Sequence, residues 1–151
     1  MVKTVNFSDI TSMVGQETGV SEWVRIDQAR INQFAEATGD HQWIHVDTSR
    51  AAKELPGGKT IAHGYLTLSL IPMLSAQIMR IDGVSRGINY GSNKVRFTNM
   101  VPVDSRVRAR QKLISAEPKA GGLQLTNEVT IEIEGMEKPA CIAETISVVF
   151  P

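Results

Sequence analysis

The sequence predicts an α+β fold in a single domain spanning residues 1–151, with an antiparallel sheet curled around one apolar helix. Helix-like segments fill the first half of the chain, strand-like segments fill the second half, and no linker or repeat separates the two halves. With 42% apolar residues, the chain is of ordinary size for one core. A sheet of about five strands covers a long apolar helix only by bending around it.

The first helix is predicted from its two ends. The segment "EWVRI" at 22–26 indicates a short strand, and Asp27 after it can accept hydrogen bonds from the free amides of a helix N-terminus. Gly39 suits the left-handed position that ends a helix. The first twenty residues show no clear hydrophobic period, so no element is predicted there.

A loop is expected over 40–46, followed by a short helix capped by Asp47 or Thr48. The segment from 64 to about 81 is apolar nearly all round, which predicts a buried helix and not an amphipathic one. Pro72 lies inside this segment and removes one backbone hydrogen bond. A kink or an early end is therefore expected there.

The strands of the second half alternate with a period of two and are joined by a long connection and two hairpin turns. They are expected over 87–97, 105–117, 123–135 and 138–150. The last strand contains Cys141, the only cysteine, which we interpret as core filling. The edge strands of so small a sheet would remain open to a second copy of the chain, which favours a homodimer.

Charge and hydropathy exclude several classes of partner. Sixteen basic residues balance sixteen acidic ones, so the chain lacks the positive surface that nucleic acids require. The most apolar stretch, 65–74, is too short to span a membrane, and the first residues do not form a secretory signal. One cysteine permits no disulfide framework. These features predict a cytoplasmic protein with neither nucleic acid nor membrane as partner.

The stretch "GDHQWIH" places Asp40 five residues before His45 and leaves several interpretations open. Both side chains could simply satisfy local hydrogen bonds. A metal site through His41 and His45 lacks the helix and the Glu of the zinc-protease motif, so we predict no metal. No nucleophile elbow is present. General acid–base chemistry remains, because a carboxylate beside an imidazole can orient it or share a water with it.

Gly64 opens the apolar helix in "AHGYLTLS". The first amides of a helix are unpaired and carry partial positive charge, so the Gly64 N–H could stabilise a developing oxyanion. A second interpretation is that a small residue is needed there for packing. The residues alone leave both open.

Together these two blocks resemble the MaoC-like dehydratases, the (R)-specific enoyl-thioester hydratases of the hot-dog fold. The Asp40-to-His45 spacing, the small residue Ala51, the Ala-His-Gly at 62–64 and the Ser five residues after Gly64 all match the family. The strand pair in "KVRFTNMVPVDSRVRAR" is similar as well. The resemblance covers most of the chain from Phe34 to Arg110.

The resemblance implies a role for each matching residue. Asp40 and His45 would hold a catalytic water, the Gly64 amide would bind the thioester oxygen, and Ser69 would support the site by hydrogen bonding near Asp40. His45 would deprotonate the water while Asp40 orients it, although the division could be reversed. No cofactor is required. The reaction would be reversible syn hydration of a trans-2-enoyl-CoA to the (3R)-3-hydroxyacyl-CoA.

Two positions depart from the family pattern, since Gln42 and Trp43 stand where the family has Asn and Pro. Gln42 would have to fold back to support the site, and Trp43 is expected to pack against the helix that carries Ala51. His63 is interpreted as structural. Two alternatives to an acyl-CoA hydratase remain: a 3-hydroxyacyl carrier-protein dehydratase of fatty-acid or polyketide synthesis, and a non-catalytic hot-dog subunit that binds acyl thioesters. The family usually dimerises through its sheets, so the resemblance also implies a homodimer.

Overall fold

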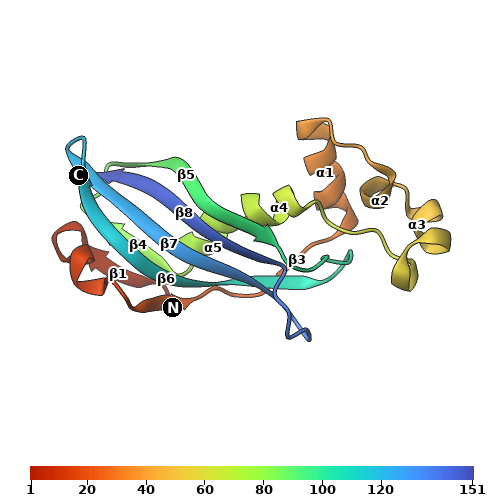
Figure 1. Cartoon of the computed structure of the whole chain (residues 1–151), viewed down its shortest axis with the longest axis horizontal. Coiled ribbons are helices and arrows are strands. Elements are labelled where there is room, and N and C mark those ends of the chain that lie inside the picture. Colours follow the sequence, from red (N-terminus) through yellow and green to blue (C-terminus); the bar gives the residue numbers. More distant parts are fainter.

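A long, strongly bent antiparallel sheet forms most of the molecule, and the computed structural model describes all residues, Met1–Pro151 (Figure 1). The strands run in the order β2-β6-β7-β8-β5, with β3 also paired to β6. Their bounds are Glu17–Val20 (β2), Val24–Arg25 (β3), Arg86–Phe97 (β5), Arg106–Lys119 (β6), Gly122–Ile133 (β7) and Cys141–Phe150 (β8). The four long strands predicted from the sequence and the antiparallel arrangement are therefore confirmed, within a few residues at each end.

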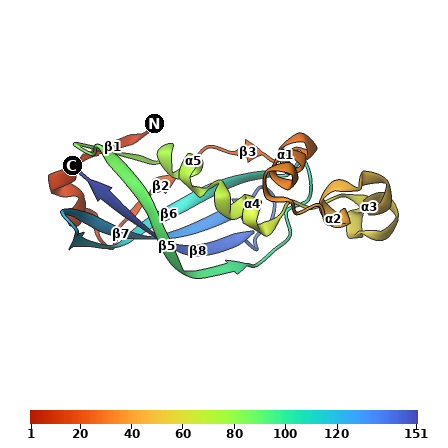
Figure 2. The same cartoon turned by 90° about the horizontal axis from the view of Figure 1, so that it is seen from above.

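The central helix lies in the concave side of this sheet and is divided in two (Figure 2). Its halves are α4, Gly64–Ser69, and α5, Ile71–Ala76, separated at Leu70. Pro72 stands in the first turn of α5, where a missing N–H costs no intrahelical bond. The predicted kink at Pro72 is confirmed.

Two expectations about this helix were wrong. It ends at Ala76, because the next segment, β4 at Met79–Asp82, pairs in parallel with β1 at Lys3–Asn6 instead of continuing as a helix. It is also not buried all round. Leu66 and Leu74 face the core, but Tyr65 is 67% exposed and Met73 39% exposed. An apolar stripe of the central helix therefore faces outward in the single chain.

The first twenty residues fold into short elements that the sequence did not reveal: β1, the 3-10 helix η1 at Phe7–Met13, and β2. Ile10 and Met13 of η1 are buried against the sheet in a second, smaller apolar cluster with Leu113 and Leu125. Strands of only four residues are too short to show a hydrophobic period. Their position is set by contacts with distant segments.

A helical arm extends beyond one end of the sheet (Figures 1 and 2). It consists of α1, Gln28–Thr38, α2, Trp43–Val46, α3, Thr48–Glu54, and the 3-10 turn η2, Pro56–Gly58. The predicted caps are confirmed: the Asp27 carboxylate accepts from the Arg30 N–H at 2.9 Å, and the Asp47 carboxylate accepts from the Arg50 N–H at 2.9 Å. Gly39 has φ of 81°. The expected loop over 40–46 is corrected, since its second half forms the single turn α2.

The main core lies between α4–α5 and the concave face of the sheet, and it includes Leu66, Leu74, Val129 and Ile131. Cys141 is completely buried there, and burial raises the pKa of its thiol to about 11. This agrees with core filling as the role of the cysteine. None of the helices combines the length and the apolar character that a transmembrane span requires.

Candidate active site

Asp40, His45 and His63 meet where the helical arm returns to the central helix. Their potential ligand or proton-accepting atoms all lie within 4.8 Å of one another. The rings of His45 and His63 are stacked with centroids 3.9 Å apart and planes inclined by 23°. Both imidazoles are buried, whereas Asp40 is exposed to solvent. The structure therefore brings together the carboxylate and the imidazole that the sequence singled out.

The hydrogen bond of His45 fixes its tautomer. Its Nδ1 lies 2.7 Å from the Ile61 carbonyl oxygen, which can only accept, so Nδ1 carries the hydrogen. Nε2 is then the unprotonated nitrogen that can take a proton. Burial is the largest influence on the pKa of His45 and lowers it, and the neighbouring His63 lowers it further. The Ile61 carbonyl and Asp40 act in the opposite direction without reversing the shift.

His63 connects the arm to the central helix. Its Nε2 donates to the backbone carbonyl of Asp40 at 3.0 Å, and it directly precedes Gly64 at the start of α4. Its Nδ1 is buried without a hydrogen-bond partner. Phe34 of α1 packs on the same ring, with centroids 4.9 Å apart. The His63 side chain thus holds the Asp40 loop by a hydrogen bond to its backbone, which agrees with the structural role predicted for His63.

Gly64 is the first residue of α4, and its N–H makes no hydrogen bond within the chain. It lines a cavity of about 390 Å³ together with His45, Thr67 and Phe97. A Cβ at this position would lie only 2.8 Å from the Phe97 ring. Both interpretations of the glycine thus have support: the amide is free to bind an oxygen, and the packing leaves no room for a side chain. Phe97 was not singled out from the sequence.

Ser69 and Gln42, which were expected to support the site by hydrogen bonding, make other contacts. The Ser69 hydroxyl donates to the Tyr65 carbonyl at 2.6 Å and lines a different cavity, so its predicted hydrogen bond near Asp40 is not formed within this chain. The reason is local, because an exposed helical serine bonds the carbonyl one turn earlier. Gln42 contributes its backbone N–H to the Asp40 carboxylate at 3.3 Å, while its side chain makes no hydrogen bond. Within this chain, the Gln42 side chain therefore does not make the hydrogen bond that a supporting role would require.

The Trp43 ring packs against α3, as predicted, with the Arg50 guanidinium carbon 3.9 Å from the ring centroid. His41 lies apart from the cluster. It is exposed, and its Nε2 is 3.5 Å from a carboxylate oxygen of Glu36. The His41–His45 pair considered as metal ligands is therefore not formed.

The three-residue cluster does not have the geometry of a shared metal site. The carbonyls of Ile61 and Asp40 each accept a hydrogen bond from one nitrogen of an imidazole. His45 Nε2 and His63 Nδ1 are then the nitrogens left to bind a metal. A metal lies near the plane of each ligating ring, at about 2.1 Å. Two stacked rings whose centroids are 3.9 Å apart and whose planes are inclined by only 23° have planes that do not meet so close to both rings. The arrangement suits proton transfer better than coordination.

Comparisons with known proteins agree with this site. A family model described as "MaoC like domain" matches residues 9–133. The chain is 52% identical over 140 residues to 3-hydroxyacyl-thioester dehydratase Z of Mycobacterium tuberculosis, covering 92% of each protein. It is 46% identical over 146 residues to nodulation protein N of Rhizobium meliloti, covering 95% of this chain and 91% of that protein.

Among solved structures, the (R)-hydratase from A. caviae involved in PHA biosynthesis superposes with a TM-score of 0.71 at 25% identity, covering 91% of this chain and 96% of that one. The chain belongs to the MaoC-like dehydratase family and has the hot-dog fold. The family and fold class predicted from the sequence are confirmed. The predicted reaction class, that of a hydro-lyase acting on acyl thioesters, agrees with the name of the 52%-identical relative.

Proposed function

We propose that the protein is an (R)-specific enoyl-CoA hydratase that works reversibly as a 3-hydroxyacyl-thioester dehydratase. The observation that carries the proposal is a buried His45 with an unprotonated Nε2, whose ring has a nitrogen within 4.8 Å of the Asp40 carboxylate, in a chain whose Gly64 N–H makes no intrachain hydrogen bond. The similarity to a 3-hydroxyacyl-thioester dehydratase and to an (R)-hydratase supports the same reaction.

In this mechanism His45 Nε2 takes a proton from a water that is held by hydrogen bonding to Asp40. The hydroxide adds to C3 of the enoyl thioester, and the negative charge that develops on the thioester oxygen is stabilised by the Gly64 N–H at the start of α4. The proton then returns through the Asp40–His45 pair to C2. Addition from one side gives the syn product, and dehydration follows the same steps backwards. The thioester itself is the electron sink, so no cofactor takes part.

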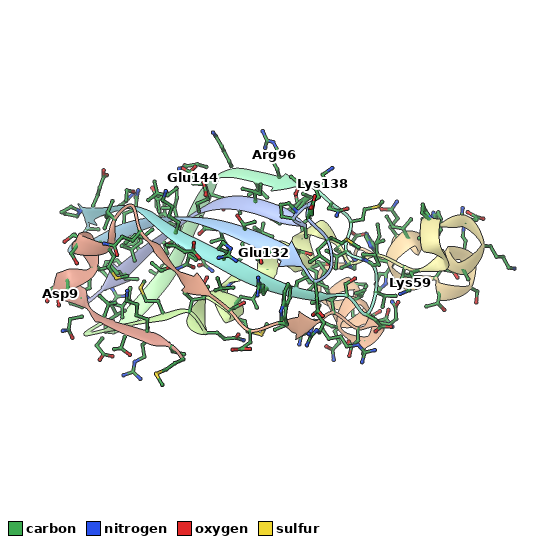
Figure 3. All side chains as sticks on the ribbon, turned by 90° about the horizontal axis from the view of Figure 1, so that it is seen from below. Asp9, Lys59, Arg96, Glu132, Lys138 and Glu144 are labelled. Atoms are coloured by element: carbon green, nitrogen blue, oxygen red, sulfur yellow. The ribbon has the colours of Figure 1, made fainter.

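Cationic residues near the small cavity favour a substrate with a phosphate-bearing arm. Lys138 lines the cavity that contains His45 and Gly64. Arg96 extends from β5 toward solvent next to the Phe97 of that cavity (Figure 3). Coenzyme A and the phosphopantetheine of a carrier protein share this phosphate chemistry. The carrier-protein dehydratase therefore remains the second candidate.

The reaction is tested by mixing the purified protein with crotonyl-CoA and following the loss of enoyl-thioester absorbance, with chiral analysis of the product. We expect turnover to the (3R)-3-hydroxy product. Turnover of the enoyl group only on a carrier protein would assign the protein to the second candidate. Absence of turnover on both would contradict catalysis and leave a thioester-binding subunit.

The activity is expected to fall in acid with a midpoint below pH 6.5. His45 must be neutral to accept a proton, and burial lowers its pKa below the ordinary value of 6.5. Activity is therefore retained as pH falls to 6.5 and is lost only as pH falls through the lowered pKa. The measurement is kcat/KM against pH. In Asp40→Asn the residual activity should show a still lower midpoint, because Asp40 raises the pKa of His45. A wild-type midpoint above 6.5 would contradict His45 as the base.

We propose that the chain forms a homodimer through β5. This twelve-residue strand pairs only with β8, so its other edge has free backbone groups, and Ile88 on it is 50% exposed. Light scattering is expected to give twice the mass of one chain, and Ile88→Lys is expected to shift the population to monomer. The control is Ile142→Lys on the inner strand β8, where Ile142 is 40% exposed. A monomeric wild type, or equal effects of the two variants, would contradict the interface.

We also propose a cytoplasmic location, which the single cysteine supports. The Cys141 thiol is fully buried and its raised pKa of about 11 keeps it protonated, so it takes part in no disulfide exchange.

A further inference from the structure

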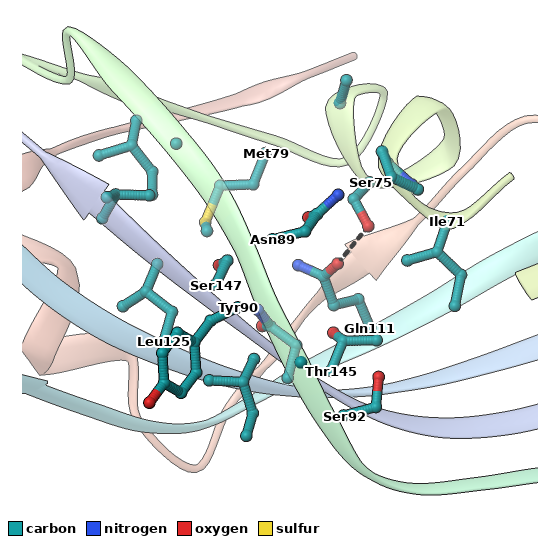
Figure 4. A pocket seen from close by; sticks show the side chains of 18 of the residues that line it. Ile71, Ser75, Met79, Asn89, Tyr90, Ser92, Gln111, Leu125, Thr145 and Ser147 are labelled. Carbon is teal, nitrogen blue, oxygen red and sulfur yellow. Dashed lines mark hydrogen bonds between the residues drawn. The ribbon is translucent and has the colours of Figure 1, made fainter. Parts of the chain in front are cut away.

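Two glutamine side chains each join separate segments of the chain through hydrogen bonds. The first is Gln111 of β6, which accepts from the Ser75 hydroxyl of α5 at 2.7 Å and donates to the Thr18 hydroxyl of β2 at 3.2 Å. Gln111 and Ser75 line a cavity of about 890 Å³ between the central helix and the sheet (Figure 4). The second is Gln28, the first residue of α1, which makes a similar set of bonds in the helical arm, next to His45.

Both ends of the Gln28 amide are hydrogen-bonded. Its Nε2 donates to the backbone carbonyl of His45 at 2.8 Å and to Asn32 Oδ1 at 2.9 Å. Its Oε1 accepts from the hydroxyl of Thr60, which is 2% exposed, at 2.5 Å. The His45 carbonyl can only accept, so the nitrogen of the amide must face it. Gln28 therefore connects α1 both to α2, which carries His45, and to the segment that leads into the central helix.

That segment also holds the imidazole of His45. Ile61 directly follows Thr60, and its carbonyl accepts from His45 Nδ1 at 2.7 Å. Three hydrogen bonds thus form a closed ring: Gln28 to the His45 backbone, the His45 side chain to the Ile61 carbonyl, and the Thr60 hydroxyl to Gln28. The bond that fixes the tautomer of His45 is one side of this ring, and Gln28 closes the ring on the other side.

The Ile61 carbonyl lies in a segment that is fixed independently of the ring. The carbonyl of Thr60 accepts from the Val103 N–H at 2.8 Å. The Ala62 N–H donates to the Val101 carbonyl, also at 2.8 Å. The acceptor of the imidazole hydrogen is therefore held in place by the neighbouring strand-like segment.

The position of the imidazole itself depends on α2, a single turn at Trp43–Val46. Isolated helical turns are marginal in water, and the carbonyls of a last turn have no partner within their own helix. The Ile61 N–H donates to the Ile44 carbonyl at 3.1 Å and holds one side of this turn. Gln28 supplies a donor for the next carbonyl, that of His45. The turn is thus placed by bonds from outside it.

We propose that Gln28 is a positioning residue for the base of the hydration: it holds the His45 backbone to Thr60 and so keeps His45 Nδ1 against the Ile61 carbonyl. This inference rests on the proposed function for the role of His45 as the base. It goes further in assigning control of the tautomer to a residue that lies outside the stretch from Asp40 to His45. Gln28 acts through His45 and does not touch the reacting atoms.

Gln28→Leu removes these hydrogen bonds and keeps a side chain of similar size. We expect kcat for crotonyl-CoA to fall about tenfold to a hundredfold with KM little changed, because a misplacement of about 1 Å at a reacting group can cost about 10²-fold. The matched control is Gln33→Leu, the same substitution on the same helix at an exposed position outside the ring of bonds. This control is expected to keep the kcat of the wild type.

The tautomer of His45 is measured directly from the ring ¹⁵N resonances of histidine-labelled protein at neutral pH without substrate. The chain has three histidines, and His45→Gln assigns the signals of His45. We expect one tautomer in the wild type, with the hydrogen on Nδ1, and exchange between both tautomers in Gln28→Leu. Gln111→Leu removes the similar set of bonds beside the large cavity and controls for a general loss of stability. The His45 signals of this control should match those of the wild type.

Thr60→Val and Thr60→Ser test the ring from its other side. Valine has the shape of threonine without the hydroxyl, so kcat is expected to fall and both tautomers of His45 to appear. Serine restores the hydroxyl, so Thr60→Ser is expected to return to the kcat and the single tautomer of the wild type. If Gln28→Leu does not fold, this pair decides the question: equal behaviour of Thr60→Val and Thr60→Ser overturns the inference.

Failure of the inference and failure of the proposed function give different results. Hydration by the wild type together with a single His45 tautomer in Gln28→Leu overturns the inference and leaves the function standing. A loss of kcat that Gln33→Leu shares overturns it as well. Absence of hydration by the wild type, together with tautomer exchange in Gln28→Leu but not in Gln111→Leu, supports the positioning of His45 by Gln28 and removes the catalytic function.

Discussion

Replacing His45 with Gln is expected to lower kcat/KM for crotonyl-CoA by about 10²- to 10⁴-fold, the usual contribution of a general base. Gln keeps a polar side chain of similar length but has no nitrogen that accepts a proton near neutral pH. Asp40→Asn is expected to have an effect in the same range, because the amide can no longer hold the water as a carboxylate does. Initial rates at saturating and subsaturating substrate separate kcat from KM, and the loss should appear in kcat.

The control for this pair is His41→Gln, an identical substitution four residues earlier in the chain. His41 is exposed, and its contact with the Glu36 carboxylate at 3.5 Å lies outside the cluster, so near-wild-type activity is expected. Far-ultraviolet circular dichroism and the mass in solution should be unchanged in all three variants. Activity close to wild type in His45→Gln or Asp40→Asn would exclude the proposed mechanism, and equal losses in His41→Gln would point to a general effect on the arm.

The second large effect is expected for Gly64→Ala. A Cβ at this position would lie 2.8 Å from the Phe97 ring, so the ring must move, and the added methyl group is also expected to crowd the N–H that we propose stabilises the oxyanion. Loss of one oxyanion donor costs about 10²- to 10³-fold in kcat. We expect a decrease of that order in Gly64→Ala, measured on crotonyl-CoA.

The double variant Gly64→Ala/Phe97→Ala separates the two roles of the glycine. If the glycine serves the oxyanion, removal of the Phe97 ring leaves activity low, because the methyl group still lies beside the amide. If the glycine serves only packing, the smaller residue at 97 makes room and activity returns to the level of Phe97→Ala alone. We expect the first result. Recovery in the double variant would remove Gly64 from the mechanism.

The local features of the fold could be predicted because their causes are local. Asp27, Gly39 and Asp47 mark helix ends through hydrogen bonds and backbone angles that depend on a few neighbouring residues. The long strands can be predicted because apolar and polar residues alternate along them over ten or more residues. The segment at 79–82 shows the limit: it follows the apolar run of the central helix without a turn signal, and its pairing with the distant residues 3–6 makes it a strand.

The sequence was enough to predict that Asp40 and His45 lie together in the candidate site, but not what surrounds them. The spacing of Asp40 and His45 is visible along the chain, but the Ile61 carbonyl that fixes the tautomer of His45 is a backbone atom with no sequence signal. Ser69 was assigned from a match of position, and its side chain bonds within its own helix turn instead. The row formed by Asn127, Thr145 and Ser92 on three neighbouring strands likewise becomes visible only when the strands are placed in register.

The helical arm separates two tasks along the chain. The side chains that we propose transfer protons, Asp40 and His45, belong to the arm, whereas the cavity of about 890 Å³ beside the central helix is lined mostly by that helix and the sheet. Substitutions in the lining of that cavity are therefore expected to leave Asp40 and His45 in place. Because the two groups of residues lie in separate segments, the lining of the cavity could change during evolution while Asp40 and His45 are kept. New variants of the cavity could then arise without an inactive ancestor.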